Sequence, residues 1–441
     1  MASWPVPKLL FSMGLPAVFS MLIQAMYNIV DTIYISRFSQ DALFAIGLVT
    51  PVQMIGLSIA MGSAVGVSTL VSRRLGEQRR DEANKVASTG FVLTFFHMLI
   101  AMGIGLFLSV PFLRLFTSRP EIIDFGYTYL KICMGVCFGQ FFSVLFERLL
   151  QAQGNMIVPM FAQLIGAITN IVLDPVFIFG AGFIPAFGIA GAAIATVAGQ
   201  ILSLIFLSFI LLTRKHDVSI SLKDFSFNKE RLGDIYAVAL PSAIMQAIGS
   251  FTTILLNNCL VDFSEEAVSS LSMYFKLQSF VFMPVFGFNQ GALPIMSYNY
   301  GARNPQRFKD TVKYFLITAA LFMGLGTYVF RYHTSLVLSF FEMTPSLEAI
   351  ATVTLKNISL SFVMAAFSII IGTVFQAFGK GTMSMIQSIL RQIGFLVPLA
   401  YLFARTGRLE LVWYAYPIAE FLVLVIFLPL AIKAFRMYFD I

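Results

Sequence analysis

The feature that most constrains this chain is a series of long apolar segments separated by charge clusters and Pro/Gly breaks. A helix needs about 20 apolar residues to cross the roughly 30 Å of bilayer hydrocarbon. Twelve segments meet that requirement, at approximately 8–36, 43–72, 86–116, 122–150, 157–180, 189–213, 235–261, 267–297, 311–340, 346–378, 382–404 and 411–435. The pattern predicts an all-α, polytopic membrane protein with twelve transmembrane helices.

Composition excludes a water-soluble globule. The chain is 58% hydrophobic and only 12% charged, whereas soluble domains are about 45–50% apolar and about 25% charged. A soluble fold leaves much of its surface wet and cannot hide this much apolar area. The net charge of +7 does not indicate nucleic acid, because the basic residues flank apolar segments. The three cysteines lie within apolar runs and predict neither a disulfide framework nor a metal site.

The distribution of Lys and Arg predicts the orientation. If both termini are cytoplasmic, 19 of the 29 basic residues fall on the inner side, including the cluster Arg73, Arg74, Arg79 and Arg80. The outer segment 262–266 is acidic. Since basic residues favour the cytoplasmic side, we expect a multi-pass protein of the plasma membrane with both termini inside.

The two halves of the chain form a repeat at a constant offset of 225 residues. Matching residues occur in three blocks, which pair Leu15-Pro16 with Leu240-Pro241, Gly62 and Gly66 with Gly287 and Gly291, and Gln151-Ala152 with Gln376-Ala377. Six spans in each half give parallel repeats, related by an axis along the membrane normal. We expect an N-lobe at 1–213, a cytoplasmic linker at 214–234 and a C-lobe at 235–441. Two bundles facing a central cleft predict transport by alternating access, with substrate bound between them.

Two acidic residues stand inside the spans of the first half. Asp31 lies toward the outer end of span one, and Tyr27 and Asn28 lie roughly on its helix face. Asp174 lies toward the outer end of span five, one turn after Asn170. Because an ionisable group in lipid is costly, such residues are functional candidates.

Further polar and proline positions accompany these acids. Thr196 and Gln200 form a polar pair one turn apart in span six. Pro16 and Pro175 each leave a carbonyl one turn earlier without an intrahelical donor, so both are predicted hinge or kink sites.

The repeat indicates that the acidic chemistry belongs to the first half. Leu256 and Leu399 stand at the positions equivalent to Asp31 and Asp174. Acids that occur in one half of a duplicated fold favour an ion-coupling site. The alternative is that both acids only cap helices or snorkel at the outer membrane surface. Two carboxylates in one low-dielectric pocket repel each other, and a bound proton would relieve that repulsion. Na⁺ held by Asp31, Asn170, Asp174 and Thr196 is the other possibility, and the residues do not choose between H⁺ and Na⁺.

Among the other intramembrane charges, one buried ion pair is expected. Glu420 in span twelve is placed to pair with either Arg391 or Lys276, and a role in substrate gating is the alternative. Lys131 and Lys356 are repeat equivalents, which favours a symmetric structural role. A polar face suited to line the substrate cleft is offered by Gln24, Asn28, Gln53, Gln200, Gln246, Asn257, Gln278 and Asn289.

Several of these stretches resemble the multidrug and toxic compound extrusion (MATE) family, in particular its DinF-like and MepA-like bacterial branch. The matching stretches are Leu15-Pro16, residues 27–32 (YNIVDT), Gly76, residues 151–154 (QAQG) and residues 170–175 (NIVLDP). The resemblance covers essentially the whole chain. It implies two six-helix lobes and a monomeric exporter of lipophilic cations, driven by H⁺ or Na⁺ and without a cofactor.

The resemblance also implies a location for the coupling site. Carried over by motif, the N-lobe cation site would involve Asp31, Asn170, Asp174 and Thr196, with Tyr27 nearby. A related branch places acidic coupling residues in helices seven and ten of the C-lobe. Here span seven offers only Gln246 and Asn257, and span ten has no acid deep within it. Cation coupling in the C-lobe is therefore not expected.

The sequence disfavours two other classes of function. A flippase of a lipid-linked precursor would share the two-lobe plan, but it would be expected to have clustered Arg and Lys in the cleft. An enzyme is not predicted, since His97, His216 and His333 form no metal-binding pair and no catalytic triad spacing occurs within the spans.

Overall fold

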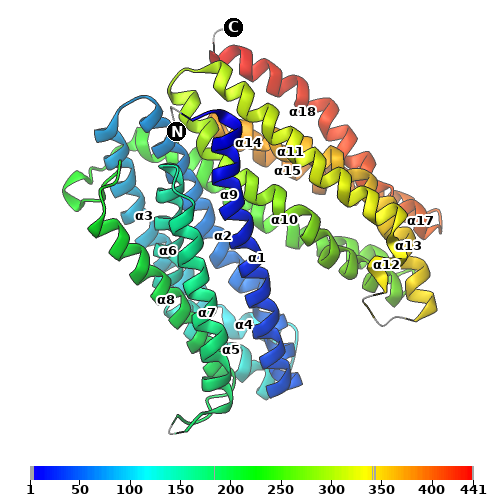
Figure 1. Ribbon diagram of the computed structural model, residues 1–441. Coiled ribbons are helices and arrows are strands. Elements are labelled where there is room, and N and C mark those ends of the chain that lie inside the picture. Colours follow the sequence, from blue (N-terminus) through cyan, green and yellow to red (C-terminus); the bar gives the residue numbers. More distant parts are fainter. Residues whose placement is uncertain (1–3, 183, 340, 342–343, 440–441) are drawn as a thin grey trace. The chain divides into compact units, whose positions relative to one another are not determined.

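A computed structural model describes residues 4–182, 184–339, 341 and 344–439. Within these residues all regular elements are helices, apart from one β-bridge between Ala181 and Ile184 (Figure 1). Eleven helices of this described part are long and apolar enough to cross a membrane, and one bent pair makes a twelfth. The predicted all-α fold with twelve spans is confirmed. The predicted end of span nine, residue 340, lies outside the described residues.

The spans of the first half follow the predicted order, but the segments predicted as single helices over 86–116 and 122–150 are each broken once. The helices are α1 (Val6–Phe38), α2 (Gln40–Gly76), α3 (Arg80–Phe107), α4 (Ser109–Arg114), α5 (Pro120–Gly135), α6 (Phe138–Ala152), α7 (Ile157–Phe179) and α8 (Ile189–Thr213). The segment predicted as one helix over 122–150 is divided into α5 and α6, which are bent by 47°. Gly135 and Gly139 flank the break, where a helix is weakest because glycine has the most backbone freedom to lose.

The second half contains more interruptions. Its helices are α9 (Lys229–Val261), α10 (Glu265–Gly301), α11 (Pro305–Tyr332), α12 (Thr334–Leu338), α13 (Pro345–Ile358), α14 (Phe362–Ala377), α15 (Gly381–Ile389), α16 (Val397–Ala404), α17 (Leu409–Val412) and α18 (Ala415–Phe439). A 3₁₀ turn separates α13 from α14, and a π-helix over Leu390–Leu396 separates α15 from α16. Pro398 follows the π-helix and cannot donate to a preceding carbonyl, which favours irregular hydrogen bonding there.

The chain divides into two compact units. Unit 1 comprises Met1–Val18 and Ile244–Ile441, and unit 2 comprises Phe19–Ala243. Both divisions fall inside a continuous helix, two residues after Pro16 in α1 and two residues after Pro241 in α9. The lobe boundaries predicted at 213 and 235 stay a prediction. The contribution of α1 and α9 to both units was not predicted from the sequence.

In unit 2, two repeated glycines of α2 allow the start of α9 to approach closely. A Cβ on Gly62 would lie 2.7 Å from the backbone oxygen of Ala239, and a Cβ on Gly66 would lie 2.6 Å from that of Ile235. Small residues permit this close packing of helix backbones inside membranes. The first turns of α9 are thereby held against α2.

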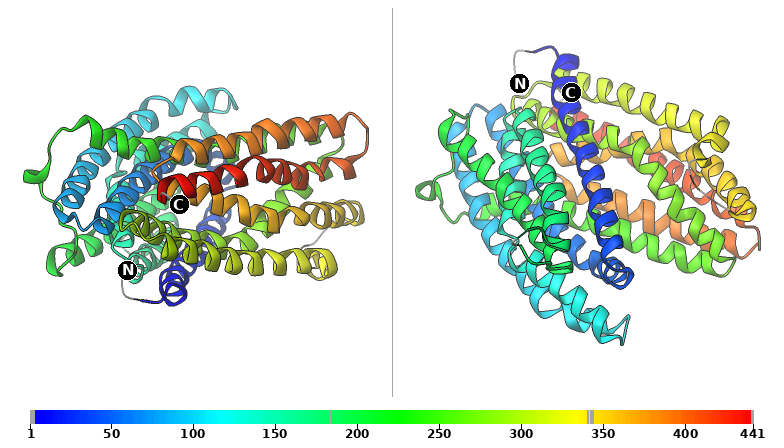
Figure 2. Two further views of the ribbon diagram at one scale, coloured as in Figure 1. Left: turned by 90° about the horizontal axis from the view of Figure 1, so that it is seen from above. Right: turned by 60° about the horizontal axis from the view of Figure 1, so that its bottom comes forward.

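Unit 1 repeats this arrangement with α1 and α10. A Cβ on Gly287 would lie 2.7 Å from the backbone nitrogen of Val18, and a Cβ on Gly291 would lie 3.1 Å from that of Gly14. Figure 2 shows these helices from two further directions. The glycine match found in the repeat therefore reflects one packing requirement, met once in each unit.

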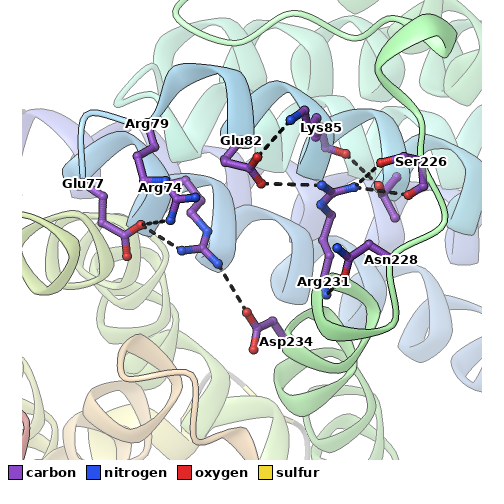
Figure 3. Close-up of polar contacts among 10 residues, drawn as sticks. Arg74, Glu77, Arg79, Glu82, Lys85, Ser226, Asn228, Arg231 and Asp234 are labelled. Atoms are coloured by element: carbon purple, nitrogen blue, oxygen red, sulfur yellow. Dashed lines mark hydrogen bonds and ion pairs between the residues drawn. The ribbon is translucent and has the colours of Figure 1, made fainter.

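The segment predicted as the linker is bound to the polar ends of α2 and α3 (Figure 3). Arg231 pairs with Glu82 at 3.5 Å and also donates to the backbone oxygen of Ser226 at 3.2 Å. Arg74 reaches both Glu77, at 2.9 Å, and Asp234, at 3.5 Å. Side chains of α2 and α3 thus hold the segment before α9 and the first turn of α9 within unit 2.

The close approach at Gly66 predicts a cost for any larger residue. We expect Gly66→Ala to lower the free energy of unfolding by about 1–3 kcal/mol, because the new methyl group must displace the α9 backbone. The matched control is Gly103→Ala in α3, where a Cβ meets nothing within 4 Å. This control should be neutral or stabilising by up to about 1 kcal/mol. Thermal unfolding in detergent compares the two, and equal transition temperatures would contradict the packing argument.

Candidate functional site

The polar residues predicted from the first half converge in unit 2. Asp31 lies on α1, Asn170 and Asp174 lie on α7, and Thr196 lies on α8. The helices α7 and α8 pack directly against each other (Figure 1). The four-residue spacing of Asn170 and Asp174 places both on the same face of α7, and the structure turns that face inward, since both are buried.

Asn170 links α7 to α8. Its Nδ2 lies 3.2 Å from Asp174 Oδ1 and 3.3 Å from Thr196 Oγ1, as donor to both. Asp174 is fully buried, and Asn170 is 2% exposed. The amide therefore satisfies one oxygen of the Asp174 carboxyl group and fixes the Thr196 hydroxyl beside it.

The Asp31 and Asp174 carboxyl groups are close enough to share a hydrogen bond when one of them holds a proton. Three buried oxygens at this place accept no hydrogen bond from the described residues, namely Asp31 Oδ1, Asn170 Oδ1 and Asp174 Oδ2. Buried polar atoms normally have a partner, so a set of unpartnered ones needs an explanation. Carboxylate and amide oxygens suit a proton or a hard cation, and the donor set fits either one.

Aromatic and sulfur side chains surround the carboxyl pair. The Tyr27 and Tyr129 hydroxyls both interact with Thr196, and Cys133 lies beside Tyr129 and Asp31. Tyr27 was predicted near the site from its spacing on α1. Tyr129 and Cys133 were not, because α5 carries no residue pattern that distinguishes them from ordinary apolar packing.

The residues predicted to line a cleft have different environments. Gln24, Asn28 and Gln246 are exposed, whereas Gln53, Gln200, Asn257, Gln278 and Asn289 are partly buried. Gln278 and Asn289 line cavities within unit 1, and the Asn289 amide oxygen accepts a hydrogen bond from the Thr373 hydroxyl. For the others, a position in a cleft stays a prediction. The hinge role of Pro16 and Pro175 also stays a prediction; both lie inside continuous helices, α1 and α7.

Unit 1 contains a different polar centre. Glu420 on α18 pairs with Arg391 of the π-helix at 3.0 Å, which confirms one of the two partners predicted for Glu420. A cavity of about 370 Å³ lies beside this pair, and Arg391 also borders a smaller one of about 160 Å³. Lys276, Lys131 and Lys356 are exposed. Neither the cavity nor the π-helix was predicted from the sequence.

The hydrogen bonds of Asn170 predict a measurable stability difference. We expect Asn170→Leu to lower the free energy of unfolding by about 1–3 kcal/mol, because Asp174 loses its buried donor. The control Asn28→Leu changes the same residue type at an exposed position of α1, where the effect should be about 0.5 kcal/mol or less. Unfolding in detergent measures both variants. An equal loss in the two would mean that the Asn170 bonds do not stabilise this site.

The chain matches a known family in both halves of the repeat. The family model described as MatE matches residues 16–176 and 241–402, which is more than half of the chain. The multidrug export protein MepA of Staphylococcus aureus (strain NCTC 8325 / PS 47) is 27% identical over 414 residues, covering 93% of this chain and 90% of that protein. A protein named FAD transporter from Shewanella oneidensis (strain MR-1) is 25% identical over 425 residues, covering 95% of this chain and 93% of its own length.

Solved structures share the fold over nearly the whole chain. A MATE crystal structure in complex with MaL6 has a TM-score of 0.93 at 24% identity, covering 99% of this chain and 98% of its own. A MOP superfamily transporter from Pyrococcus furiosus, described as having a binding pocket of reverse polarity, has a TM-score of 0.92 at 25% identity, covering 99% of this chain and 97% of its own. The twelve-helix arrangement is thus that of the solved MATE transporters.

Proposed function

The chain belongs to the MatE family of membrane transporters, and we propose that it is a multidrug exporter that expels lipophilic organic cations in exchange for H⁺ or Na⁺. MepA, a relative over nearly the whole chain, is named as a multidrug export protein. The proposal places the protein in a bacterial plasma membrane as a monomer, with both termini cytoplasmic. Residues 1–213 form one lobe, 214–234 the linker and 235–441 the other lobe.

The observation that carries the proposal is the carboxyl pair of unit 2. Asp31 and Asp174 approach each other, and three oxygens of this cluster have no donor among the described residues. Asp174 is buried and Asp31 is partly buried, yet no Lys or Arg of the described residues forms an ion pair with either acid. A proton or Na⁺ would supply the missing partner.

The same pair explains how exchange is coupled. When both acids are ionised they attract a cation, and the hydroxyls of Tyr27 and Tyr129 lie close by to help bind it. A proton or Na⁺ at this pair reduces that negative charge and so weakens the attraction for an organic cation. Occupancy by coupling ion and occupancy by substrate therefore oppose each other, which is the requirement for antiport.

Simple energetics limit the driving force. Exchange of one H⁺ for one monovalent cation is electroneutral and draws only on the pH gradient, which supplies about 1.4 kcal/mol per unit. A membrane potential of 100 mV adds about 2.3 kcal/mol for each net charge moved. Stronger accumulation thus requires more than one H⁺ per substrate or a Na⁺ gradient, and two acids provide places for two protons.

Transport in proteoliposomes tests the proposal. Ethidium flux is measured under a pH gradient, a Na⁺ gradient or neither, with wild type, Asp31→Asn and Asp174→Asn. We expect one gradient to drive flux in the wild type, and each variant to lose at least about tenfold of that driven flux. The reason is that an amide cannot take up the coupling proton or supply the ionic charge that holds Na⁺.

The matched control is Asp262→Asn, which changes an exposed acid after α9 and should keep gradient-driven flux within about twofold, as expected for a surface change away from any buried contact. Full driven flux in Asp31→Asn would overturn coupling at the carboxyl pair. Gradient-independent flux in the wild type would overturn antiport altogether and favour the flippase alternative.

A further inference from the structure

We propose that the cavity of unit 1 beside Arg391 is a second ligand site, which binds an aromatic compound through that compound's carboxylate. The site lies entirely among residues 249–420 and shares no residue with the carboxyl pair of unit 2. It is independent of the proposed cation exchange and would extend the ligands of this protein to organic anions and zwitterions.

The polar groups of this site form a connected set of hydrogen bonds around Glu420. Glu420 Oε1 accepts from Arg391 Nη1 at 3.0 Å, and Glu420 Oε2 accepts from the Ser368 hydroxyl at 2.6 Å. Gln387 Nε2 donates to the Ser368 backbone oxygen at 2.9 Å, which links α15 to α14. Both oxygens of Glu420 are therefore occupied by donors. This carboxylate positions Arg391 and is poorly placed to hold a cationic ligand.

Arg391, in contrast, keeps donors available. Its side chain is 27% exposed, against 11% for Glu420, and it borders the cavity of about 370 Å³ as well as that of about 160 Å³. Only Nη1 makes a hydrogen bond to another described residue, so Nη2 and Nε have no protein acceptor among these residues. A guanidinium group presents its donors as a planar fork that matches a carboxylate, and such charge-assisted bonds are about twice as strong as neutral ones.

The rest of the cavity suits an aromatic body. Phe275, Phe282 and Phe286 line it together with the polar side chains of Gln278 and Thr252. Its volume of about 370 Å³ lies within the range of small-molecule sites, which are mostly apolar with a few polar groups that fix orientation. The arrangement selects a flat ring that carries one anionic group.

The equivalent positions in the first half of the repeat show that the fold does not require a cavity at this place. The positions equivalent to Arg391 and Glu420 are Gly166 and Ala195. There α7 and α8 pack so closely that a Cβ on Gly199 would lie 2.6 Å from the Gly166 backbone oxygen. In unit 1 the corresponding segment is a π-helix, a rare element that occurs often at functional sites. An ion pair kept for stability alone has little advantage over apolar packing, so ligand binding explains the departure better.

Fluorescence titration of the full chain in detergent tests the site. The probe is dansylglycine, which carries a carboxylate, and dansylamide serves as the matched probe with the same ring and no charge. We expect saturable dansylglycine binding to the wild type, with dansylamide at least about tenfold weaker, because it lacks the charge-assisted hydrogen bonds.

Two variants separate ligand binding from a structural ion pair. Glu420→Gln removes the anion that competes for the guanidinium, so dansylglycine should bind about tenfold more tightly. The double variant Arg391→Gln with Glu420→Gln leaves no unpaired charge and should weaken dansylglycine binding by at least about tenfold. If the double variant does not fold, Arg391→Lys keeps the charge without the fork and should weaken binding at least about threefold.

The outcomes are distinct from those of the transport experiment. Asp31→Asn should leave dansylglycine affinity unchanged within about twofold, since the two sites share no residue and no coupling between them is assumed. No saturable dansylglycine binding to folded wild type, or unchanged affinity in the Arg391 variants, would overturn the proposal whatever the flux assay shows. Tighter binding in Glu420→Gln together with loss in the double variant would support it, because a purely structural pair predicts neither change.

Discussion

Hydrocarbon offers no hydrogen bonds, and that constraint organises this protein. Every crossing segment has to satisfy its own backbone, which is why the described chain is helical with one isolated β-bridge. The apolar effect that drives soluble cores does not bring helices together in lipid, so close packing and polar contacts must do it. The repeated glycines of α2 and α10 supply the close packing, and Asn170 between α7 and α8 supplies a polar contact.

Because lipid supplies no hydrogen bonds, the polar side chains within the spans also need partners. In unit 2 two acids approach each other without a basic partner, and buried oxygens accept nothing from the described residues. In unit 1 an acid and a base neutralise each other, with a cavity beside the base. The first arrangement is short of positive charge and suits a cation. The second is neutral overall, but two nitrogens of its guanidinium group have no protein acceptor among the described residues.

Duplication explains how two such centres arise on one scaffold. The equivalent of Asp31 is Leu256, and the equivalent of Arg391 is Gly166. Each unit therefore uses a position that its counterpart leaves apolar or closely packed. The helix geometry at these positions also differs between the units. In unit 1 the π-helix contains Arg391, whereas in unit 2 glycines allow α7 and α8 to pack closely. Shared architecture thus supports different chemistry at equivalent positions of the two halves.

Much of this protein was determined by its sequence. Long apolar segments predict helices because the bilayer sets their length, and the constant offset revealed the repeat, including the glycines that meet α1 and α9. The unpaired acids were visible as costly residues within apolar runs. Family resemblance added the grouping of Asp31, Asn170, Asp174 and Thr196, of which the structure brings the last three into direct hydrogen-bond contact.

Other features were decided only by the tertiary structure. Whether Glu420 pairs with Arg391 or Lys276 depends on how helices turn toward one another, and hydropathy carries no information about rotation. Tyr129 and Cys133 join the acid site because α5 packs against α8, and a cavity forms where a π-helix faces α18. The division of α1 and α9 between two units likewise depends on contacts far apart in the chain. Local sequence sets which segments become helices, whereas packing between distant segments sets which side chains meet.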